Sequence, residues 1–272
     1  MTNLGEASYV LGIEIIRDRE RGFLGLSQKG YIEKVLKRFY MLNCAGGEVP
    51  VSKGDKLSTE QSPKTEQERL EMADRPYASL VGSLMYAQVC TRPDLAFAVS
   101  VLGRFQSNPG QARWVATKKV LRYLQRTKNC KLVYRQSEDL ELVGYADADL
   151  GGCVDSMKST SGFVFLFESG AVSWKSVKQT LTATLTMQAE YIACYEATSQ
   201  AIWLKNFITS LQVVESLERP IQIWNDNSSA VFFAKSNKRT SGSRHIKFKY
   251  LSVREDVKEG LVNIDALTLT LW

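Results

Sequence analysis

Histidine and paired cysteines are scarce in this chain. His245 is the sole histidine among 272 residues, so a Ser-His-Asp triad would have to use it. The cysteines are odd in number, scattered and without a CxxC pair: Cys44, Cys90, Cys130, Cys153 and Cys194. These scarcities exclude a zinc site built from several His or Cys ligands, and they indicate reduced, intracellular thiols. Any metal would be held by oxygen ligands, which favours Mg²⁺, Mn²⁺ or Ca²⁺.

Long apolar runs are missing as well. No run approaches the length that crosses a bilayer, and the opening stretch "MTNLGEASYVLGIEI" has no basic region followed by an apolar core. We therefore expect no secretory signal, no anchor and no membrane partner, and an intracellular location, either cytoplasmic or nuclear. Because 44% of the residues are hydrophobic and 24% are charged, the chain has enough apolar surface for a core.

Acidic residues are missing from one long segment. Between Arg104 and Arg135 the chain has nine basic residues and no Asp or Glu. A region of one sign favours a polyanion partner over a merely solvated helix face. The stretch "QARWVATKKVLRYLQRT" has helical spacing and puts its basic residues in a stripe at every fourth position. The nucleic-acid contacts predicted in this segment are Arg113, Lys118, Lys119, Arg122, Arg126 and Lys128.

The pattern of the chain changes near residue 131. Before it, alternation predicts one strand from Tyr9 to Ile15, a return strand "FLGLS", a helix in "SQKGYIEKVLKRFYML", a polar linker and then three helices. After it, "CKLVYRQ" is a predicted strand, and the elements from "ELVGYADAD" onward follow the order β-β-β-α-β-α-α-β. Three antiparallel strands followed by parallel additions predict an α/β fold with a mixed sheet flanked by helices.

Three acids stand where α/β sheets hold their sites. Asp147 ends the strand in "GYADADLGG", Asp226 ends "IQIWND", and Glu190 lies near the start of a predicted helix over about residues 187–211. Crowded carboxylates repel each other unless a cation is present, and paired Mg²⁺ ions are a device for phosphodiester hydrolysis. Taken singly, each acid also fits a structural role: Asp226 as a helix cap, Glu190 on the helix dipole, and Asp147 or Asp149 in a turn.

Ordered motifs over nearly all of the chain resemble the C-terminal part of the Pol polyprotein of copia-type retrotransposons. "LGEASYVLGIEIIRDRERGFLGLSQKGYIEKVLKRFYM" is similar to the end of the reverse transcriptase palm. "YASLVGSLMYAQVCTRPDLAFAVSVLGRFQSNPG" and "WVATKKVLRYLQRT" are similar to the thumb and connection region. "GYADADLGG", "KSTSGFVFLFESGAVSWKSVKQ", "QAEYIA", "WNDNSSA" and "SRHI" are similar to the ribonuclease H domain. The resemblance implies a partial palm tail over residues 1–43, a linker over 44–75, a helical thumb or connection region over 76–137, and a ribonuclease H-like domain over 138–272.

The resemblance also implies a chemistry. The family's nuclease cleaves the RNA strand of an RNA/DNA hybrid with Mg²⁺ (or Mn²⁺), and its first three acids map onto Asp147, Glu190 and Asp226 as catalytic and metal-binding residues. Asp149 is a weaker candidate. Arg244 and His245 of "SRHI" are predicted to contact nucleic acid. The remainder of a Pol polyprotein is a further expected partner.

Departures from the family pattern leave two functions open. The polymerase's paired-aspartate motif lies upstream of such a segment in the family, so polymerase activity is not expected here. Leu150, Leu185, Gln188 and Asn225 replace residues that the family usually carries, Asn225 standing where Cys is frequent. The family's fourth acid follows the last strand, whereas Asp265 falls within it, and the tail resembles a C-terminal truncation. The chain is thus either an active nuclease or a decayed remnant that binds nucleic acid without cleaving it.

Overall fold

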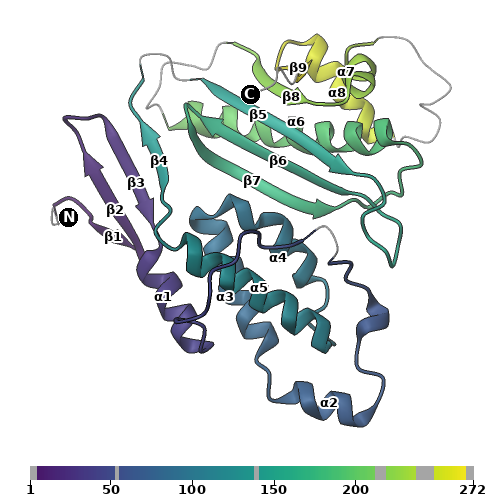
Figure 1. Cartoon of the computed structure of the whole chain (residues 1–272). Coiled ribbons are helices and arrows are strands. Elements are labelled where there is room, and N and C mark those ends of the chain that lie inside the picture. The colour runs from purple at the N-terminus through teal and green to yellow at the C-terminus, as the bar shows by residue number, and fades with distance from the viewer. Residues whose placement is uncertain (1–4, 53–54, 138–140, 212–218, 237–247, 268–272) are drawn as a thin grey trace. The chain divides into compact units, whose positions relative to one another are not determined.

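The chain folds as two units, divided between residues 136 and 137. The computed structural model (Figure 1) describes residues 5–52, 55–137, 141–211, 219–236 and 248–267. Each unit has its own sheet and its own hydrophobic core. Among the helices within these ranges, none combines the length and the apolar character needed to span a bilayer.

A four-stranded antiparallel sheet with the order β1-β2-β3-β4 forms one part of the first unit. Its strands are β1 (Tyr9–Val10), β2 (Ile13–Asp18), β3 (Phe23–Ser27) and β4 (Leu132–Arg135). The prediction of a single strand from Tyr9 to Ile15 is wrong. Leu11 and Gly12 adopt positive φ angles of 50° and 78° and turn the chain back, so that Tyr9 pairs with Glu14.

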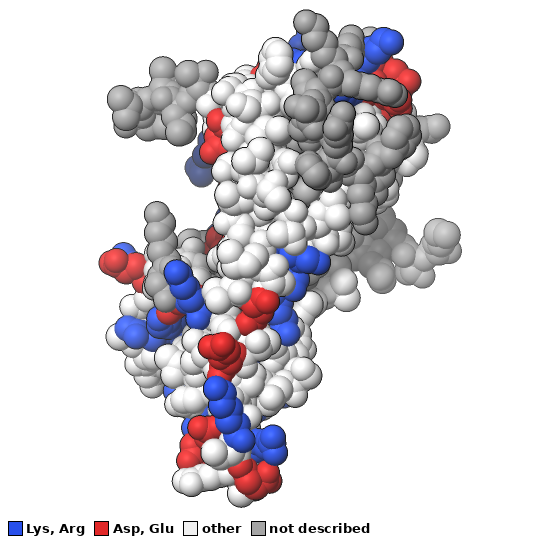
Figure 2. Space-filling model, turned by 90° about the vertical axis from the view of Figure 1, so that its right-hand side faces the viewer, with Lys and Arg blue, Asp and Glu red and all other residues white. Residues whose placement is uncertain are grey.

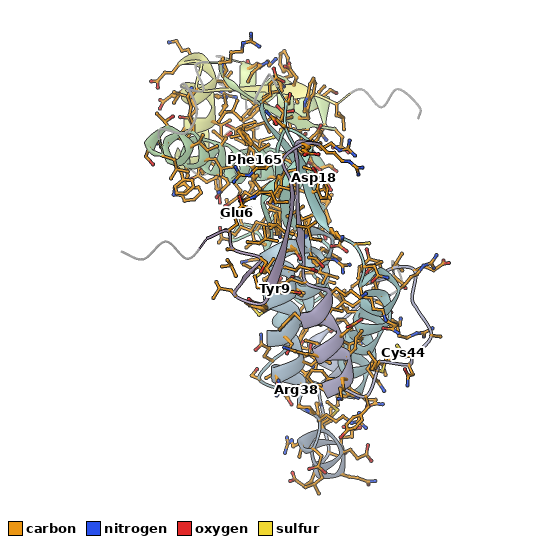
Figure 3. The ribbon with its side chains drawn as sticks, turned by 90° about the vertical axis from the view of Figure 1, so that its left-hand side faces the viewer. Glu6, Tyr9, Asp18, Arg38, Cys44 and Phe165 are labelled. Carbon is orange, nitrogen blue, oxygen red and sulfur yellow. The ribbon has the colours of Figure 1, made fainter. Side chains whose placement is uncertain are left out.

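The fourth strand of this sheet comes from more than a hundred residues further along the chain. β4 pairs antiparallel with β3, with Leu26 opposite Leu132 and Phe23 opposite Arg135. The predicted strand "CKLVYRQ" therefore exists, but it completes the first sheet. Figure 3 labels Tyr9 in β1 and Asp18 at the end of β2, and it also labels Glu6, which forms an ion pair of 2.5 Å with Arg19.

Within the described residues, five helices complete the first unit. They are α1 (Lys29–Arg38), α2 (Glu66–Ala73), α3 (Tyr77–Thr91), α4 (Ala96–Gly103) and α5 (Gln111–Thr127), with short 3₁₀ turns η1 (Thr59–Gln61) and η2 (Pro93–Leu95). The predicted helices are all present, and the apolar positions spaced three and four apart face a common core with Leu36, Leu80 and Leu121 fully buried. The polar stretch predicted as linker contains η1 and α2, and each begins with a capping box, at Ser58 and Thr65.

The second unit is built on a five-stranded mixed sheet with the order β7-β6-β5-β8-β9. Its elements are β5 (Leu142–Asp149), β6 (Thr160–Phe167), β7 (Gly170–Lys178), α6 (Thr186–Ser210), β8 (Ile221–Asn225), α7 (Ser228–Lys235), a 3₁₀ turn η4 (Phe248–Leu251), α8 (Ser252–Lys258) and β9 (Val262–Ala266). β5, β6 and β7 are antiparallel, whereas β8 and β9 run parallel to β5. This topology confirms the predicted ribonuclease H-like mixed sheet flanked by helices.

Small side chains let α6 lie close to the middle of this sheet. Buried alanines recur every four residues along the helix: Ala189, Ala193, Ala197 and Ala201. On β5, Ala146 and Ala148 are buried on the opposing side. Gly144 lies under the ring of Phe165, which Figure 3 labels; a Cβ at Gly144 would stand 2.4 Å from a ring carbon. The close approach brings the start of α6 to the end of β5.

Candidate metal centre

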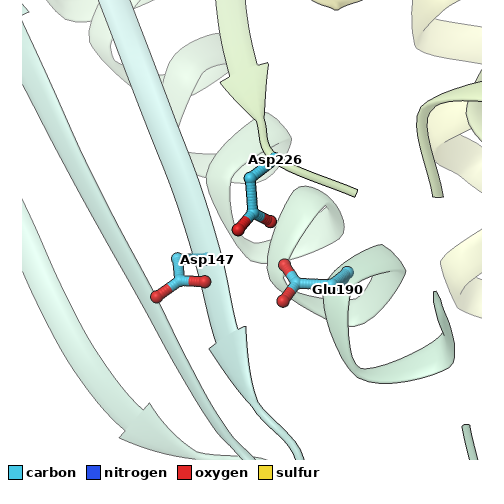
Figure 4. A group of neighbouring side chains, drawn as sticks. All are labelled: Asp147, Glu190 and Asp226. Atoms are coloured by element: carbon cyan, nitrogen blue, oxygen red, sulfur yellow. The ribbon is translucent and has the colours of Figure 1, made fainter. Parts of the chain in front are cut away.

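The structure brings Asp147, Glu190 and Asp226 together (Figure 4). Each carboxylate offers one oxygen, and these oxygens all lie within 4.8 Å of one another. Asp147 stands near the end of β5, and Asp226 follows the last residue of β8. Because β5 and β8 are parallel and Ala146 pairs with Asn225, the two aspartates leave neighbouring strands at the same edge of the sheet. Glu190 reaches the same point from α6.

The Glu190 carboxylate is held by two N–H donors. The backbone N–H of Ala148 donates to Oε1 at 3.2 Å, and the side-chain amide of Asn225 donates to Oε2 at 2.9 Å. Glu190 is 3% exposed, whereas Asp147 and Asp226 are exposed to solvent. The group therefore has one fixed, buried carboxylate and two that remain open to a ligand.

Burial and like charge raise the pKa of two of these carboxyls. The pKa of Glu190 is raised to about 7, first because burial penalises the charged form and then because Asp147 and Asp226 carry the same charge, against the opposing effect of its hydrogen bonds. The pKa of Asp147 is also raised, by burial first and by the Asp226 carboxylate next. The cluster thus carries negative charge that a cation would neutralise.

A pH effect on stability follows from Glu190 when divalent cations are removed. Its folded-state pKa of about 7 exceeds the ordinary value of 4.5, so the folded protein binds this proton more tightly than the unfolded chain. The stabilising contribution is complete below pH 4.5 and is lost as pH rises through 7, a loss of roughly 3 kcal/mol. Thermal unfolding of the wild type and Glu190→Gln from about pH 4 to pH 8 should show two curves that diverge as pH rises, because only the wild type loses this contribution. Parallel curves would contradict this assignment.

The donor set fits a divalent cation that prefers oxygen. All three groups are carboxylates, their oxygens converge, and two of them face solvent. Hard cations such as Mg²⁺ bind through one or two carboxylates and keep several waters, which agrees with an open cluster of this kind. Asp147, Glu190 and Asp226 are the residues that could hold it.

Asp149 and Asp265 form hydrogen bonds with other parts of the second unit. Asp149 accepts a hydrogen bond from the backbone N–H of Thr160, and a Cβ on Gly152 would stand 1.7 Å from its Oδ2, so its carboxylate is packed within the turn after β5. Asp265 lies on β9, where it pairs with Lys235 and accepts hydrogen bonds from Gln222 and Asn263 at 3.1 and 2.7 Å. The ion pair with Lys235 is the main cause of its lowered pKa. Asp265 is not a member of the acidic cluster.

The structure corrects the assignment of Arg113. This residue is fully buried, with its guanidinium 3.9 Å from the centroid of the Phe105 ring. Its Nη1 donates to Ser62 Oγ at 2.9 Å and to the carbonyl of Asn108 at 2.8 Å, and its Nη2 donates to the carbonyl of Ser58. A guanidinium without exposed surface cannot reach a phosphate, so Arg113 joins η1 to α5 and is not a nucleic-acid contact.

Three other basic residues of α5 contact Ala45, Glu48 or Asp55. Lys119 pairs with Asp55 at 2.5 Å, and Arg126 pairs with Glu48 at 3.1 Å. Arg122 donates from Nε to the carbonyl of Ala45 at 3.1 Å. The sequence pattern could not show that Glu48 and Asp55 pair with basic residues of this helix.

Four further residues were predicted to contact nucleic acid. Lys118 is half-buried with its ammonium 5.9 Å from the Trp114 ring centroid, and Lys128 contacts Gln125 at 3.5 Å. Arg244 and His245 lie outside the described residues. On the face shown in Figure 2, basic and acidic side chains are interspersed around the lowest helix, α2. A nucleic-acid role for the basic residues of α5 stays a prediction.

The sequence pattern missed Asn225 as a member of the site. It is 1% exposed and contacts Glu190 directly. The available signal was a polar side chain in an inward position of the strand "IQIWN", whose buried positions alternate. A buried amide at such a position needs hydrogen-bond partners, and these are the neighbouring strand and the carboxylate.

Comparisons with known proteins give relatives along almost the whole chain. No protein-family model matches it. The chain is 42% identical over 259 residues, 95% of its length, to a retrovirus-related Pol polyprotein from transposon TNT 1-94 of Nicotiana tabacum, and it spans 19% of that polyprotein. It is 49% identical over 133 residues to the secreted RxLR effector protein 161 of Plasmopara viticola, covering 49% of this chain and 94% of that protein. A solved foamy viral protease-reverse transcriptase (dRH) in complex with double-stranded DNA shares its fold, with a TM-score of 0.51 and 12% identity over 98% of this chain and 38% of that one.

Proposed function

Because the chain belongs to the retrovirus-related Pol polyproteins of transposons, we propose that its second unit is a metal-dependent ribonuclease H. The proposed reaction is hydrolysis of the RNA strand of an RNA/DNA hybrid. The chain spans about a fifth of the length of its tobacco relative, so the proposal concerns this portion and takes the rest of a Pol polyprotein as a partner.

The observation that carries the proposal is the convergence of three carboxylates from separate elements. Asp147, Glu190 and Asp226 come from β5, α6 and the end of β8, and their oxygens lie within 4.8 Å of one another. A cluster of like charge at the edge of a sheet is unfavourable by itself: the Asp226 carboxylate raises the pKa of Asp147, and both aspartates raise the pKa of Glu190. Chains retain such clusters where a cation and a substrate use them.

The three residues of the cluster would have different roles in binding the cation. Asp147 and Asp226 are exposed, so they would hold Mg²⁺ where a phosphodiester can approach from solvent. Glu190 is buried and fixed by Ala148 and Asn225, so it would complete the ligand set with little loss of side-chain entropy. Bound there, the cation would activate water and neutralise charge on the phosphate. Recognition of a hybrid would use its shape, phosphates and 2′-hydroxyl groups.

Removal of the metal tests this proposal directly. The full chain is incubated with a hybrid whose RNA strand is labelled at its 5′ end, in Mg²⁺, in Mn²⁺ and in excess EDTA. We expect cleavage of RNA in either cation, and a loss of about 100-fold or more in EDTA, because the cluster then repels the phosphate. Duplex DNA and duplex RNA of the same sequence are the matched controls, and both should stay intact. Retained, salt-sensitive binding without cleavage would support the non-catalytic remnant in place of the nuclease.

A further inference from the structure

The side-chain amide of Asn225 forms hydrogen bonds through both its nitrogen and its oxygen. Its Nδ2 donates to the carbonyl of Ala146 at 3.0 Å and to Oε2 of Glu190 at 2.9 Å. Its Oδ1 accepts from the backbone N–H of Asn227 at 2.9 Å. The residue is 1% exposed, so water does not compete for these bonds.

These three hydrogen bonds connect the elements that carry Asp147, Glu190 and Asp226. Ala146 directly precedes Asp147 on β5, Asn225 itself directly precedes Asp226, and Glu190 is bonded without an intermediary. The bond to Asn227 fixes the backbone on the far side of Asp226, where Asn227 caps α7 through a bond from the Ala230 N–H at 3.0 Å. One amide therefore sets the relative positions of the three carboxylates.

We propose that Asn225 is a positioning residue for the metal centre, which holds Glu190 in the orientation that ligates the cation and sets the strand ends that carry Asp147 and Asp226. This inference rests on the proposed function. Hydrogen-bonded partners of metal ligands orient them, and their loss typically costs 10- to 100-fold in metal affinity or activity.

The chemistry of the carboxamide explains why other side chains would serve less well. A side chain with two N–H groups can donate at once to a carbonyl and a carboxylate, and its own oxygen remains to accept. An apolar residue would leave the Ala146 carbonyl and one Glu190 oxygen buried without this donor. An aspartate would keep the size but lose both donors and add a charge beside the carboxylates.

A double-mutant cycle on cation affinity tests the proposal. Mn²⁺ binding is measured by isothermal titration calorimetry and electron paramagnetic resonance for the wild type, Asn225→Ala, Glu190→Ala and the double variant. We expect Asn225→Ala to weaken Mn²⁺ binding about 10-fold or more in the wild type, and by a smaller factor when Glu190 is already Ala, because only the effect through Asp147 and Asp226 then remains. Equal losses in both backgrounds would overturn the proposal, because Asn225 would then act on the fold in general.

Asn263→Ala is the matched control. Its Nδ2 also donates two hydrogen bonds in the same sheet, to Gln222 Oε1 at 2.9 Å and to Asp265 Oδ2 at 2.7 Å, but it does not contact the cluster. We expect its Mn²⁺ affinity to stay within about 2-fold of the wild type, and a 10-fold loss here would overturn the assignment. Circular dichroism of each variant shows whether the fold is kept.

A measurement on the unaltered chain covers the case in which Asn225→Ala does not fold. In a ¹⁵N-labelled sample, the side-chain amide signals of Asn225 should shift during a Mg²⁺ titration, with the affinity that calorimetry gives for the same ion. Signals that stay unchanged while Mg²⁺ binds would contradict the proposal. If neither Mn²⁺ nor Mg²⁺ binds the wild type, the proposed nuclease function itself fails, and the two failures are thereby told apart.

Discussion

Asp147→Asn is expected to lower the rate of hybrid cleavage by about 100-fold or more while leaving the second unit folded. The substitution keeps the size of the side chain but removes a charged oxygen from the group that converges with Glu190 and Asp226. Because Asp147 is exposed, the change costs little packing. Single-turnover cleavage of the labelled hybrid at saturating Mg²⁺ measures the rate, and thermal unfolding shows whether the fold is intact.

Asp149→Asn is the matched control for this prediction. It makes the same change two residues further along β5, in a carboxylate that accepts a hydrogen bond from the Thr160 N–H. An asparagine oxygen can accept the same bond, so cleavage should fall by no more than a few-fold, roughly. If both variants lose activity equally, or if Asp147→Asn retains full activity, Asp147 is not the residue that binds the metal.

Arg113→Ala is expected to destabilise the first unit by about 3 kcal/mol or more. The substitution removes a fully buried guanidinium and leaves the carbonyls of Ser58 and Asn108 without this donor. The contact with the Phe105 ring is lost as well, and a cavity replaces the side chain. Urea unfolding followed by circular dichroism measures the change in the free energy of unfolding.

Arg122→Ala provides the comparison on the same helix. Its side chain is exposed and donates a hydrogen bond to the carbonyl of Ala45, so the expected loss is below about 1 kcal/mol. A loss for Arg113→Ala as small as that for Arg122→Ala would show that the buried bonds of Arg113 are replaced by other donors. Salt dependence of hybrid binding by the two variants separately tests whether Arg122 contributes to nucleic-acid contact.

Much of the second unit was predictable because its pattern is local and regular. Alternating residues in "LVGYADAD" predicted the strand, and the element order predicted parallel additions to the sheet. The structure adds that "IQIWND" is the direct neighbour of this strand, which places Asp147 beside Asp226. The position of Glu190 followed from the helix that begins just before it. Once the strand order is known, the sequence pattern is sufficient to bring the three carboxylates together.

The failures concern contacts between residues distant in sequence. Arg113 and Arg122 are equally basic and lie on one helix, yet one is buried against η1 and the other is exposed. Contacts with Ser58, Ser62 and Asn108 bury Arg113, and periodicity within α5 carries no information about these distant residues. Leu11 is a different failure, because an apolar residue in an alternating run adopts a positive φ, which few non-glycine residues do.

The acidic cluster takes its members from β5, α6 and the end of β8, so it forms only when these three elements have folded together. No hairpin or single helix carries two of its members, so the site does not exist until all three elements have left the ribosome and docked. A cation that binds this centre therefore favours the folded state by mass action, by about 2.7 kcal/mol at a concentration 100 times its dissociation constant. The divalent ion would thus stabilise only those conformations in which β5, α6 and the end of β8 are already docked together.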